Sequence, residues 1–181
     1  NKINIISDGA AYGISFAKMS SKLSNINVTN NEIVIHSNDM AYLIEFHIVD
    51  NSTIANNKLY SDCNSSFAIG LYQSCNINVT DNEITLFGGN LDKNTTLDVL
   101  GLGNSPISLI NNVKNITIAG NLIYTNVTNP ILFKNVDNVS SVNITSNSYV
   151  IDNSNINVFF DSNNQLIPGI ISCYNRLLIN N

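Results

Sequence analysis

Eight residues occur almost unchanged twice, as INVTNNEI at 26–33 and INVTDNEI at 77–84, and a looser copy, STIANNKL, lies at 52–59. When these copies are aligned on the Asn near the end of each, further copies appear along the chain. The aligned residues are Asp8, Asn31, Asn57, Asn82, Asn121, Asn147 and Asn175. Neighbouring positions lie 23–28 residues apart, except for one interval of 39 residues after Asn82. A period of this length indicates a solenoid, a propeller or a repeat array.

The residues around the aligned Asn follow one pattern in most copies. In the second INVT copy, Ile77 and Val79 precede the Asn by five and three positions, and Ile84 follows it by two. The other copies hold mainly Ile, Val or Leu at these places. Apolar, preferentially β-branched residues two positions apart predict short strands with one buried face. The intervening positions hold small polar residues such as Asn78 and Thr80, which suit a solvent-exposed face.

Short strands separated by tight turns cannot bury their apolar face within one repeat, but stacked repeats share a continuous interior. We therefore predict an all-β parallel β-helix solenoid of about seven coils, which spans residues 1–181 as a single domain. A propeller would need longer repeats with antiparallel hairpins, and a leucine-rich repeat would show a Leu-dominated frame. Neither feature is evident in this sequence.

The aligned position is Asn in six of seven copies, and this uniformity predicts an Asn ladder. Identical amides stacked about 4.8 Å apart can bond to one another and to backbone groups at a bend. A buried amide without a partner would cost ~1–3 kcal/mol, so burial requires such pairing. The preceding position holds Asn30, Asn56 and Asp81 in successive copies, residue types that accept a left-handed backbone. The alternative explanation is the composition bias of a chain with 35 Asn residues.

This Φ-x-Φ-x-x-N-x-Φ repeat, with its turn Asn and its period of about 25 residues, resembles the right-handed parallel β-helix proteins of the pectin-lyase-like superfamily. The 35 Asn and 26 Ile residues also resemble the composition of adhesin-like surface proteins of methanogenic archaea. The resemblance extends over nearly the whole chain. It implies a right-handed solenoid that is a fragment of a longer extracellular protein at the cell surface, with neighbouring repeats as partners. Because this fold hosts polysaccharide lyases and hydrolases as well as structural stalks, function has to be argued from a site.

Charge and hydropathy argue against two classes of partner. The net charge is −5, and the eight basic residues are scattered, so no basic patch is available to neutralise the phosphates of a nucleic acid. No run of about 18 apolar residues predicts a membrane span. The cysteines, Cys63, Cys75 and Cys173, match no metal-binding spacing and are expected to be small buried apolar groups.

A column of candidate binding residues stands ten positions before the aligned Asn. Its members are Ser21, His47, Tyr72, Asn111 and Asp137. Stacked along one outer face, these side chains could contact a polysaccharide or a cell-surface glycan through ring stacking and hydrogen bonds. They could equally be unrelated exposed residues beside a turn. One position after the aligned Asn, Glu32, Lys58 and Glu83 alternate in charge, which predicts a surface charge ladder and not an acid–base pair.

The long interval contains an insertion at about 87–106, FGGNLDKNTTLDVLGLGNSP, which we predict to be a loop that projects from the solenoid. Such loops commonly carry binding specificity. Asp92, Asn94, Thr96 and Asp98 alternate within it as in a calcium loop. However, Leu97 and Gly103 stand where that loop needs Gly and a bidentate Glu, so a solvated loop without a cofactor is the simpler interpretation.

The sequence favours a non-catalytic segment that acts as a rigid spacer and presents a glycan- or cell-binding face. The alternative is a polysaccharide lyase or hydrolase, which would need two or three carboxylates with a Lys or Arg in one groove. We expect no such groove, because the only Arg is Arg176 and no strand carries clustered Asp residues. Nine Asn-x-Ser/Thr sequons also permit glycosylation of a surface protein: Asn27, Asn51, Asn64, Asn78, Asn94, Asn115, Asn126, Asn138 and Asn143.

Overall fold

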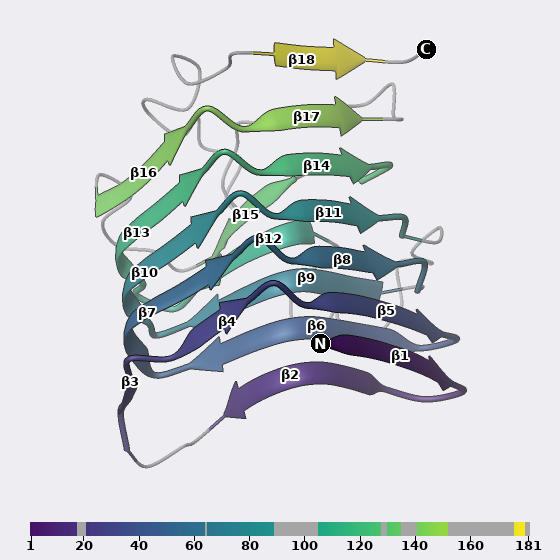
Figure 1. Ribbon diagram of the computed structural model, residues 1–181, viewed down its shortest axis with the longest axis horizontal. Helices are drawn as coiled ribbons and strands as arrows, with labels where there is room; N and C mark the ends of the chain where they lie inside the picture. The colour runs from purple at the N-terminus through teal and green to yellow at the C-terminus, as the bar shows by residue number, and fades with distance from the viewer. Residues whose placement is uncertain are drawn as a thin grey trace.

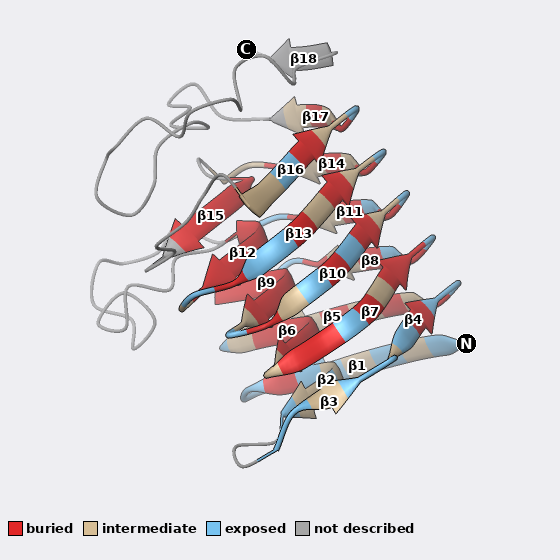
Figure 2. Cartoon of the chain, turned by 90° about the vertical axis from the view of Figure 1, so that its left-hand side faces the viewer, coloured by how far each residue is buried: buried red, intermediate tan, exposed pale blue. Residues whose placement is uncertain are grey.

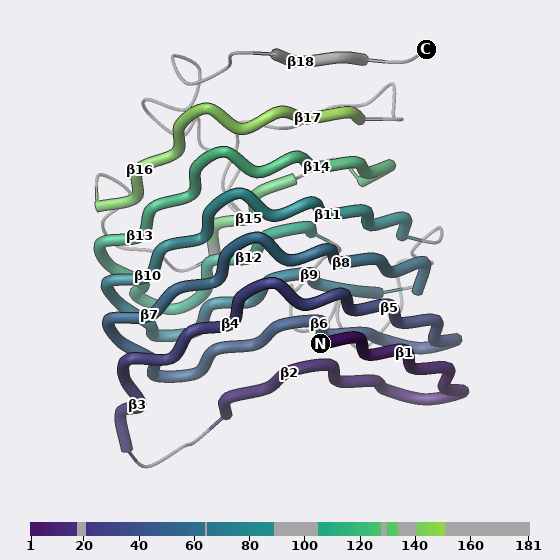
Figure 3. Tube along the Cα trace, in the orientation of Figure 1, coloured from purple at the N-terminus to yellow at the C-terminus, as the bar shows by residue number. Residues whose placement is uncertain are grey.

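The computed structural model describes residues 1–17, 21–63, 65–88, 105–127, 130–134, 141–151 and 176–179. These residues form a parallel β-solenoid, in which the chain winds through three sheets and every recorded strand pair is parallel (Figures 1 and 3). The predicted all-β parallel solenoid is confirmed. Among the described residues, no helix is long and apolar enough to cross a membrane.

The three sheets are numbered in order of decreasing number of described strands. Sheet 1 contains β1 (Lys2–Ser7), β5 (Glu32–Ser37), β8 (Lys58–Ser61), β11 (Glu83–Leu86), β14 (Leu122–Thr125), β17 (Ser148–Ile151) and β18 (Arg176–Ile179). Sheet 2 contains β3 (Leu23–Ser24), β4 (Asn27–Thr29), β7 (Val49–Ala55), β10 (Cys75–Thr80), β13 (Lys114–Ala119) and β16 (Val142–Thr145). Sheet 3 contains β2 (Ala11–Ala17), β6 (Met40–His47), β9 (Ser65–Tyr72), β12 (Ser105–Ile110) and β15 (Ile131–Lys134).

The interior is filled by columns of apolar side chains that repeat from turn to turn. In sheet 1, one column consists of Ile33, Leu59, Ile84, Ile123 and Tyr149, which are directly paired across neighbouring strands and at most 3% exposed. Figure 2 shows the same division of buried and exposed residues along the strands of sheet 2. Burial of the apolar surface of these columns contributes about 25 cal/mol per Å² to the stability of the fold. Because each column extends over several turns, this contribution stabilises the stack and not any single turn.

The corner between sheets 2 and 1 carries the predicted Asn ladder. The side-chain amide of Asn57 donates to Oδ1 of Asn82 at 3.0 Å, and that of Asn82 donates to Oδ1 of Asn121 at 2.9 Å. Each inner amide also donates to a backbone carbonyl and accepts from a backbone N–H. The Asn82 amide, for example, donates to the Ile54 carbonyl and accepts from the Asn57 N–H. The same contacts link Asn31 to Asn57 and Asn121 to Asn147. Asn175 lies outside the described residues.

The prediction that Asp8 begins this ladder is wrong. Strand β1 pairs with β5 in the register Lys2↔Glu32, which places Asn1 beside the first ladder Asn, and Asn1 Nδ2 donates to Asn31 Oδ1 at 3.0 Å. Asp8 lies after β1 and accepts a hydrogen bond from Asn38 Nδ2 at 3.1 Å. Strands of sheets 1 and 2 have the same alternation of apolar residues, so the pattern alone assigned β1 to the wrong sheet.

The number of turns also differs from the prediction. The structure makes about five turns, whereas the repeat predicted about seven coils. The first predicted repeat is not a full coil, because β1 begins after the ladder corner. The last one, aligned on Asn175, falls outside the described residues.

The residue before each ladder Asn has the left-handed backbone that the sequence predicts. The φ angles are 57° at Asn30, 56° at Asn56, 55° at Asp81, 68° at Gly120 and 56° at Ser146. Asn and Asp tolerate this conformation better than other residues with a Cβ, and Gly adopts it freely. The bend therefore directs the next side chain, the ladder amide, into the corner at every turn.

Replacement of one inner ladder amide should cost far more than replacement of an exposed Asn. In Asn82→Ala, the N–H groups of Asn57 lose their acceptor and the Asn121 Oδ1 loses a donor. We expect the free energy of unfolding to fall by about 2–4 kcal/mol, measured by urea denaturation followed by circular dichroism. The exposed Asn78→Ala is the matched control in protein produced without glycans, and it should change the free energy of unfolding by less than about 0.5 kcal/mol. Equal effects of the two substitutions would contradict the role of the ladder.

Candidate functional site

The outer face of sheet 3 holds the most heavily buried acidic side chain of the described chain. In β6, both Leu43 and Ile44 belong to the apolar core, so the alternation of the strand breaks between them. In a regular strand, Tyr42 would face the opposite side from Glu45 and His47. Because of this break, all three side chains lie on the outer face. Glu45 pairs with Ser15 of β2 and lies beside it on this face.

Glu45 is the centre of a short hydrogen-bonded chain. Ser15 Oγ donates to Glu45 Oε2 at 2.7 Å, and His47 Nε2 lies 2.7 Å from Glu45 Oε1. The Glu45 side chain is only 9% exposed. Burial raises the pKa of this carboxyl, but the hydrogen bonds from His47 and Ser15 outweigh burial and leave the pKa below its ordinary value. Glu45 is therefore an ionised carboxylate at neutral pH that fixes the orientation of the His47 ring.

Aromatic rings surround this polar chain. Tyr12 and Tyr42 stack with their ring centroids 5.1 Å apart and an interplanar angle of 8°. The rings of His47 and Tyr72 stack at 4.2 Å, and Tyr42 also contacts Phe67. Burial raises the pKa of Tyr42 to about 12, with a smaller contribution from neighbouring negative groups, so its hydroxyl stays protonated. We call Tyr12, Ser15, Tyr42, Glu45, His47 and Tyr72 the aromatic face.

A glycine makes room for one of these rings. Gly70 of β9 pairs with Glu45, and a Cβ at this position would lie 3.1 Å from the ring of Tyr72. The absence of a side chain therefore allows the Tyr72 ring to lie over the strand, where it meets the ring of His47. The same register places Tyr72 beside His47 on the next turn.

The structure brings together two of the sequence-predicted binding residues. The pairing of His47 with Tyr72 is confirmed. The inclusion of Asn111 is wrong, because Tyr72 pairs with Ile110. Asn111 and Asn112 both have positive φ, and the corner that they form contains one residue more than the corner after β9. The distance from the outer column to the ladder Asn is therefore one residue longer in this turn. Asp92, Asn94, Asp98 and Asp137 lie outside the described residues, so their proposed contacts stay predictions.

Glu45, Ser15 and Tyr42 were missed by the sequence reasoning. Their distance from the ladder Asn does not reveal their side of the sheet, because all three belong to strands whose alternation is irregular. One signal was available, since Glu45 stands two positions before His47 in a strand that is otherwise apolar from Ala41 to Phe46. An acidic residue within an apolar strand needs a partner, because an unpaired buried charge is costly.

Sheet 1 carries a second polar feature, the predicted charge ladder. Lys58 Nζ lies 3.3 Å from Glu83, and the ladder extends one turn further than predicted because Lys2 Nζ lies 2.8 Å from Glu32. The hydrogen bond from Lys2 lowers the pKa of Glu32 despite some desolvation. Glu32, Lys58 and Glu83 also line one shallow groove. The expectation that no groove would combine two carboxylates with a Lys is therefore wrong.

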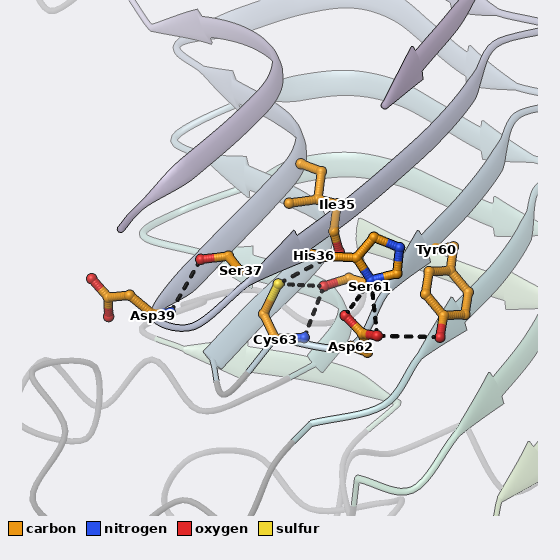
Figure 4. A network of polar contacts seen from close by, with 8 residues as sticks. All are labelled: Ile35, His36, Ser37, Asp39, Tyr60, Ser61, Asp62 and Cys63. Carbon is orange, nitrogen blue, oxygen red and sulfur yellow. Dashed lines mark hydrogen bonds and ion pairs between the residues drawn. The ribbon is translucent and has the colours of Figure 1, made fainter. Parts of the chain in front are cut away.

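A third cluster joins β5 and the end of β8 on the outside of sheet 1 (Figure 4). His36 Nδ1 lies 2.8 and 2.9 Å from the two carboxylate oxygens of Asp62, and the hydroxyl of Tyr60 donates to Asp62 at 3.5 Å. These side chains are exposed or half-buried, so water weakens the interaction. The arrangement is a solvent-exposed ion pair when His36 is protonated.

The described cysteines have structural surroundings. Cys63 is fully buried, its Sγ accepts from Ser61 Oγ at 3.1 Å, and burial raises the pKa of its thiol (Figure 4). Cys75 is half-buried and donates to the Asp50 carboxylate at 3.0 Å, while burial and that carboxylate raise its pKa. Both thiols are therefore protonated and weakly nucleophilic. The prediction of a small buried group is confirmed for Cys63, and Cys173 is outside the described residues.

Chemistry at these three places is limited by the partners that the groups already have. At the aromatic face, the carboxylate favours the His47 tautomer with its proton on Nε2, which leaves Nδ1 as the acceptor. Within the described ranges, no group of three or more His, Cys, Asp or Glu side chains could hold a metal ion. Comparison with protein-family models, curated proteins and solved structures finds no match. The function has to be judged from the geometry of the chain itself.

Stability should depend on pH through Glu45. Because its folded-state pKa is lowered, the carboxylate stabilises the fold fully above its ordinary pKa of 4.5, and this contribution is lost as pH falls through the folded value. We expect the difference in urea midpoint between the natural chain and Glu45→Gln to shrink as pH falls below 4.5. Parallel curves for the two proteins across this acidic range would show that Glu45 is not held as a paired carboxylate.

Proposed function

We propose that this chain is a non-catalytic extracellular segment of an adhesin-like surface protein, acting as a rigid spacer with a glycan- or cell-binding face. We further propose that its solenoid is the right-handed β-helix of the pectin-lyase-like superfamily, and that neighbouring repeats of a parent chain stack on it at the cell surface. The observation that carries the proposal is the unbroken amide ladder, which makes the turns one stiff body and presents their outer faces in fixed register.

The spacer role is supported by how the turns are joined. Each turn is tied to the next by strands in three sheets and by the corner amides. Neighbouring turns are about 4.8 Å apart, so five of them extend over roughly 24 Å. To bend this rod, hydrogen bonds would have to be lengthened on one side and the apolar columns opened, both of which cost free energy. Such a body transmits position and orientation along its axis.

The binding role is supported by the aromatic face. Tyr12 is 51% exposed, and its ring is held in place by stacking on Tyr42. A flat, fixed ring offers an apolar surface to the C–H groups of a sugar, with little loss of side-chain entropy on binding. The half-buried His47 offers a hydrogen-bonding nitrogen to sugar hydroxyls on the same face. This face therefore suits a neutral polysaccharide or a cell-surface glycan.

Removal of the exposed ring should weaken glycan binding. We expect Tyr12→Ala to bind about 3- to 10-fold more weakly in a screen of glycans and cell-wall polysaccharides, because one stacking contact is lost. The readout is affinity electrophoresis, followed by titration calorimetry of any glycan that is retained. Tyr124→Ala is the matched control, since Tyr124 is a half-buried tyrosine of sheet 1 and should leave binding unchanged.

Two results of that screen would count against the aromatic face. If Tyr12→Ala and Tyr124→Ala weaken binding equally, the effect is a general one on the fold. If deletion of residues 89–104, which leaves β12 intact, abolishes binding while Tyr12→Ala leaves it unchanged, the loop and not the sheet holds the ligand. Deletion without any effect would remove the loop from the binding proposal.

The alternative function is that of a polysaccharide lyase or hydrolase, favoured by the groove that Glu32, Lys58 and Glu83 line. We expect no turnover of uronic-acid polymers, because Lys58 is paired with Glu83 and all three side chains are well exposed to water. Release of reducing ends or unsaturated products is the measurement. Activity that disappears in Lys58→Met, with the urea midpoint unchanged, would establish the alternative and overturn the non-catalytic proposal.

A further inference from the structure

Three of the sequons lie at regular intervals on the outer face of sheet 2. Two columns of residues on the outer side of sheet 2 run across β4, β7, β10, β13 and β16. The first column is Asn27, Thr53, Asn78, Thr117 and Asn143. The second column, two residues further along each strand, is Thr29, Ala55, Thr80, Ala119 and Thr145. Every second turn therefore displays an Asn and a Thr side by side, and the turns between display Thr and Ala.

The Asn residues of the first column are accessible. Asn27, Asn78 and Asn143 are all exposed, whereas the residues that follow them in the sequence, Val28, Val79 and Ile144, point into the core. Within the part of the chain that the structure describes, the three side-chain amides form no hydrogen bond. The Asn and the hydroxyl residue of each sequon therefore face solvent together, which is what an enzyme needs to bind both.

Other sequons of the described chain are placed differently. Asn126 forms two hydrogen bonds with the backbone of Gly88. Its Nδ2 donates to the Gly88 carbonyl at 2.9 Å, and its Oδ1 accepts from the Gly88 N–H at 2.9 Å. Asn115 donates to Asn76 at 3.0 Å. Asn51 and Asn115 also have the left-handed backbone of a corner, with φ of 46° and 52°. These amides do not belong to the column of sheet 2.

We propose that Asn27, Asn78 and Asn143 carry N-linked glycans, so that sheet 2 is a sugar-coated face of the solenoid. The proposal rests on the extracellular location proposed above. The glycan donor is a lipid-linked oligosaccharide diphosphate. The amide nitrogen attacks the anomeric carbon of the donor, the bond from this carbon to the phosphate oxygen breaks, and the diphosphate leaves with the electron pair. The nitrogen loses one proton to the transferase, and no oxidation or reduction occurs.

The register gives the glycans room. Consecutive turns are about 4.8 Å apart, so sugars on every second turn are separated by roughly 10 Å. Sugars on every turn would be crowded, and the intervening Thr53 and Thr117 avoid this. Because the aromatic face belongs to sheet 3, the glycans of sheet 2 stand on a different sheet from the proposed ligand site.

The experiment is site-resolved mass spectrometry of the protein isolated from its own cells. We expect Asn27, Asn78 and Asn143 to carry glycans and Asn126 to carry none. Asn78→Thr and Thr80→Ala should each remove one glycan mass, because the first deletes the acceptor and the second deletes the hydroxyl. Both substitutions introduce residue types that the same columns already contain, at Thr53 and Ala55, so the fold should be retained. Asn126→Gln should leave the glycan mass unchanged.

Three outcomes would overturn the proposal. These are the absence of glycans at all three sites, occupancy of Asn126 equal to theirs, and retention of the Asn78 glycan in Thr80→Ala. Protease treatment of intact cells tests the extracellular location by itself, and it therefore separates an error in the glycosylation proposal from an error in the proposed function. A chain that the protease reaches but that carries no glycans overturns the sugar-coated face alone. A chain that is protected inside the cell and carries no glycans overturns both.

Discussion

The column of corner amides determines where each turn of this chain begins. An Asn at this corner needs an acceptor from one neighbouring turn and a donor from the other, so each turn is satisfied only when its neighbours are in place. The long interval between Asn82 and Asn121 shows how strong the constraint is, because their amides still meet at 2.9 Å. Most of the additional residues of that repeat lie between β11 and β12, and one lies at the corner of Asn111 and Asn112, so the amide corner is unchanged. Repeat length can therefore vary wherever the chain does not pass the amide column.

This constraint explains which parts of the structure could be predicted from the sequence. The ladder from Asn31 to Asn147 was predictable because a buried amide allows few substitutions, and the preceding left-handed residue narrows the choice further. The place of Asp8 was not, since strands of sheets 1 and 2 share one alternation of apolar residues. Asn111 was misplaced because a corner with two left-handed residues accepts an extra one. Tyr42 was not predicted to share a face with Glu45 and His47 because β6 breaks its alternation between Leu43 and Ile44, which no local pattern indicates.

The three sheets share one interior but present different chemistry to the outside. Sheet 1 presents alternating charges, sheet 2 presents uncharged Asn and Thr columns, and sheet 3 presents aromatic rings around a buried carboxylate. A solenoid can keep such faces separate because each outward column is independent of the others, while the inward columns hold the turns together. The proposed spacer, sugar-coated and ligand-binding roles therefore need not compete for the same residues. Specialisation of one face leaves the core and the corner amides unchanged.

The alternating charges of sheet 1 have a consequence for how the turns find each other during folding. All amides of the corner column are alike, so the column alone would also accept a strand that has slipped by one turn. In the native order, Lys2, Glu32, Lys58 and Glu83 give unlike neighbours. If β1 slipped past β5 onto β8, Lys2 would face Lys58, and like charges opposite each other repel. The alternating charges therefore disfavour a pairing that is shifted by one turn, although the hydrogen-bonded corner would tolerate that shift.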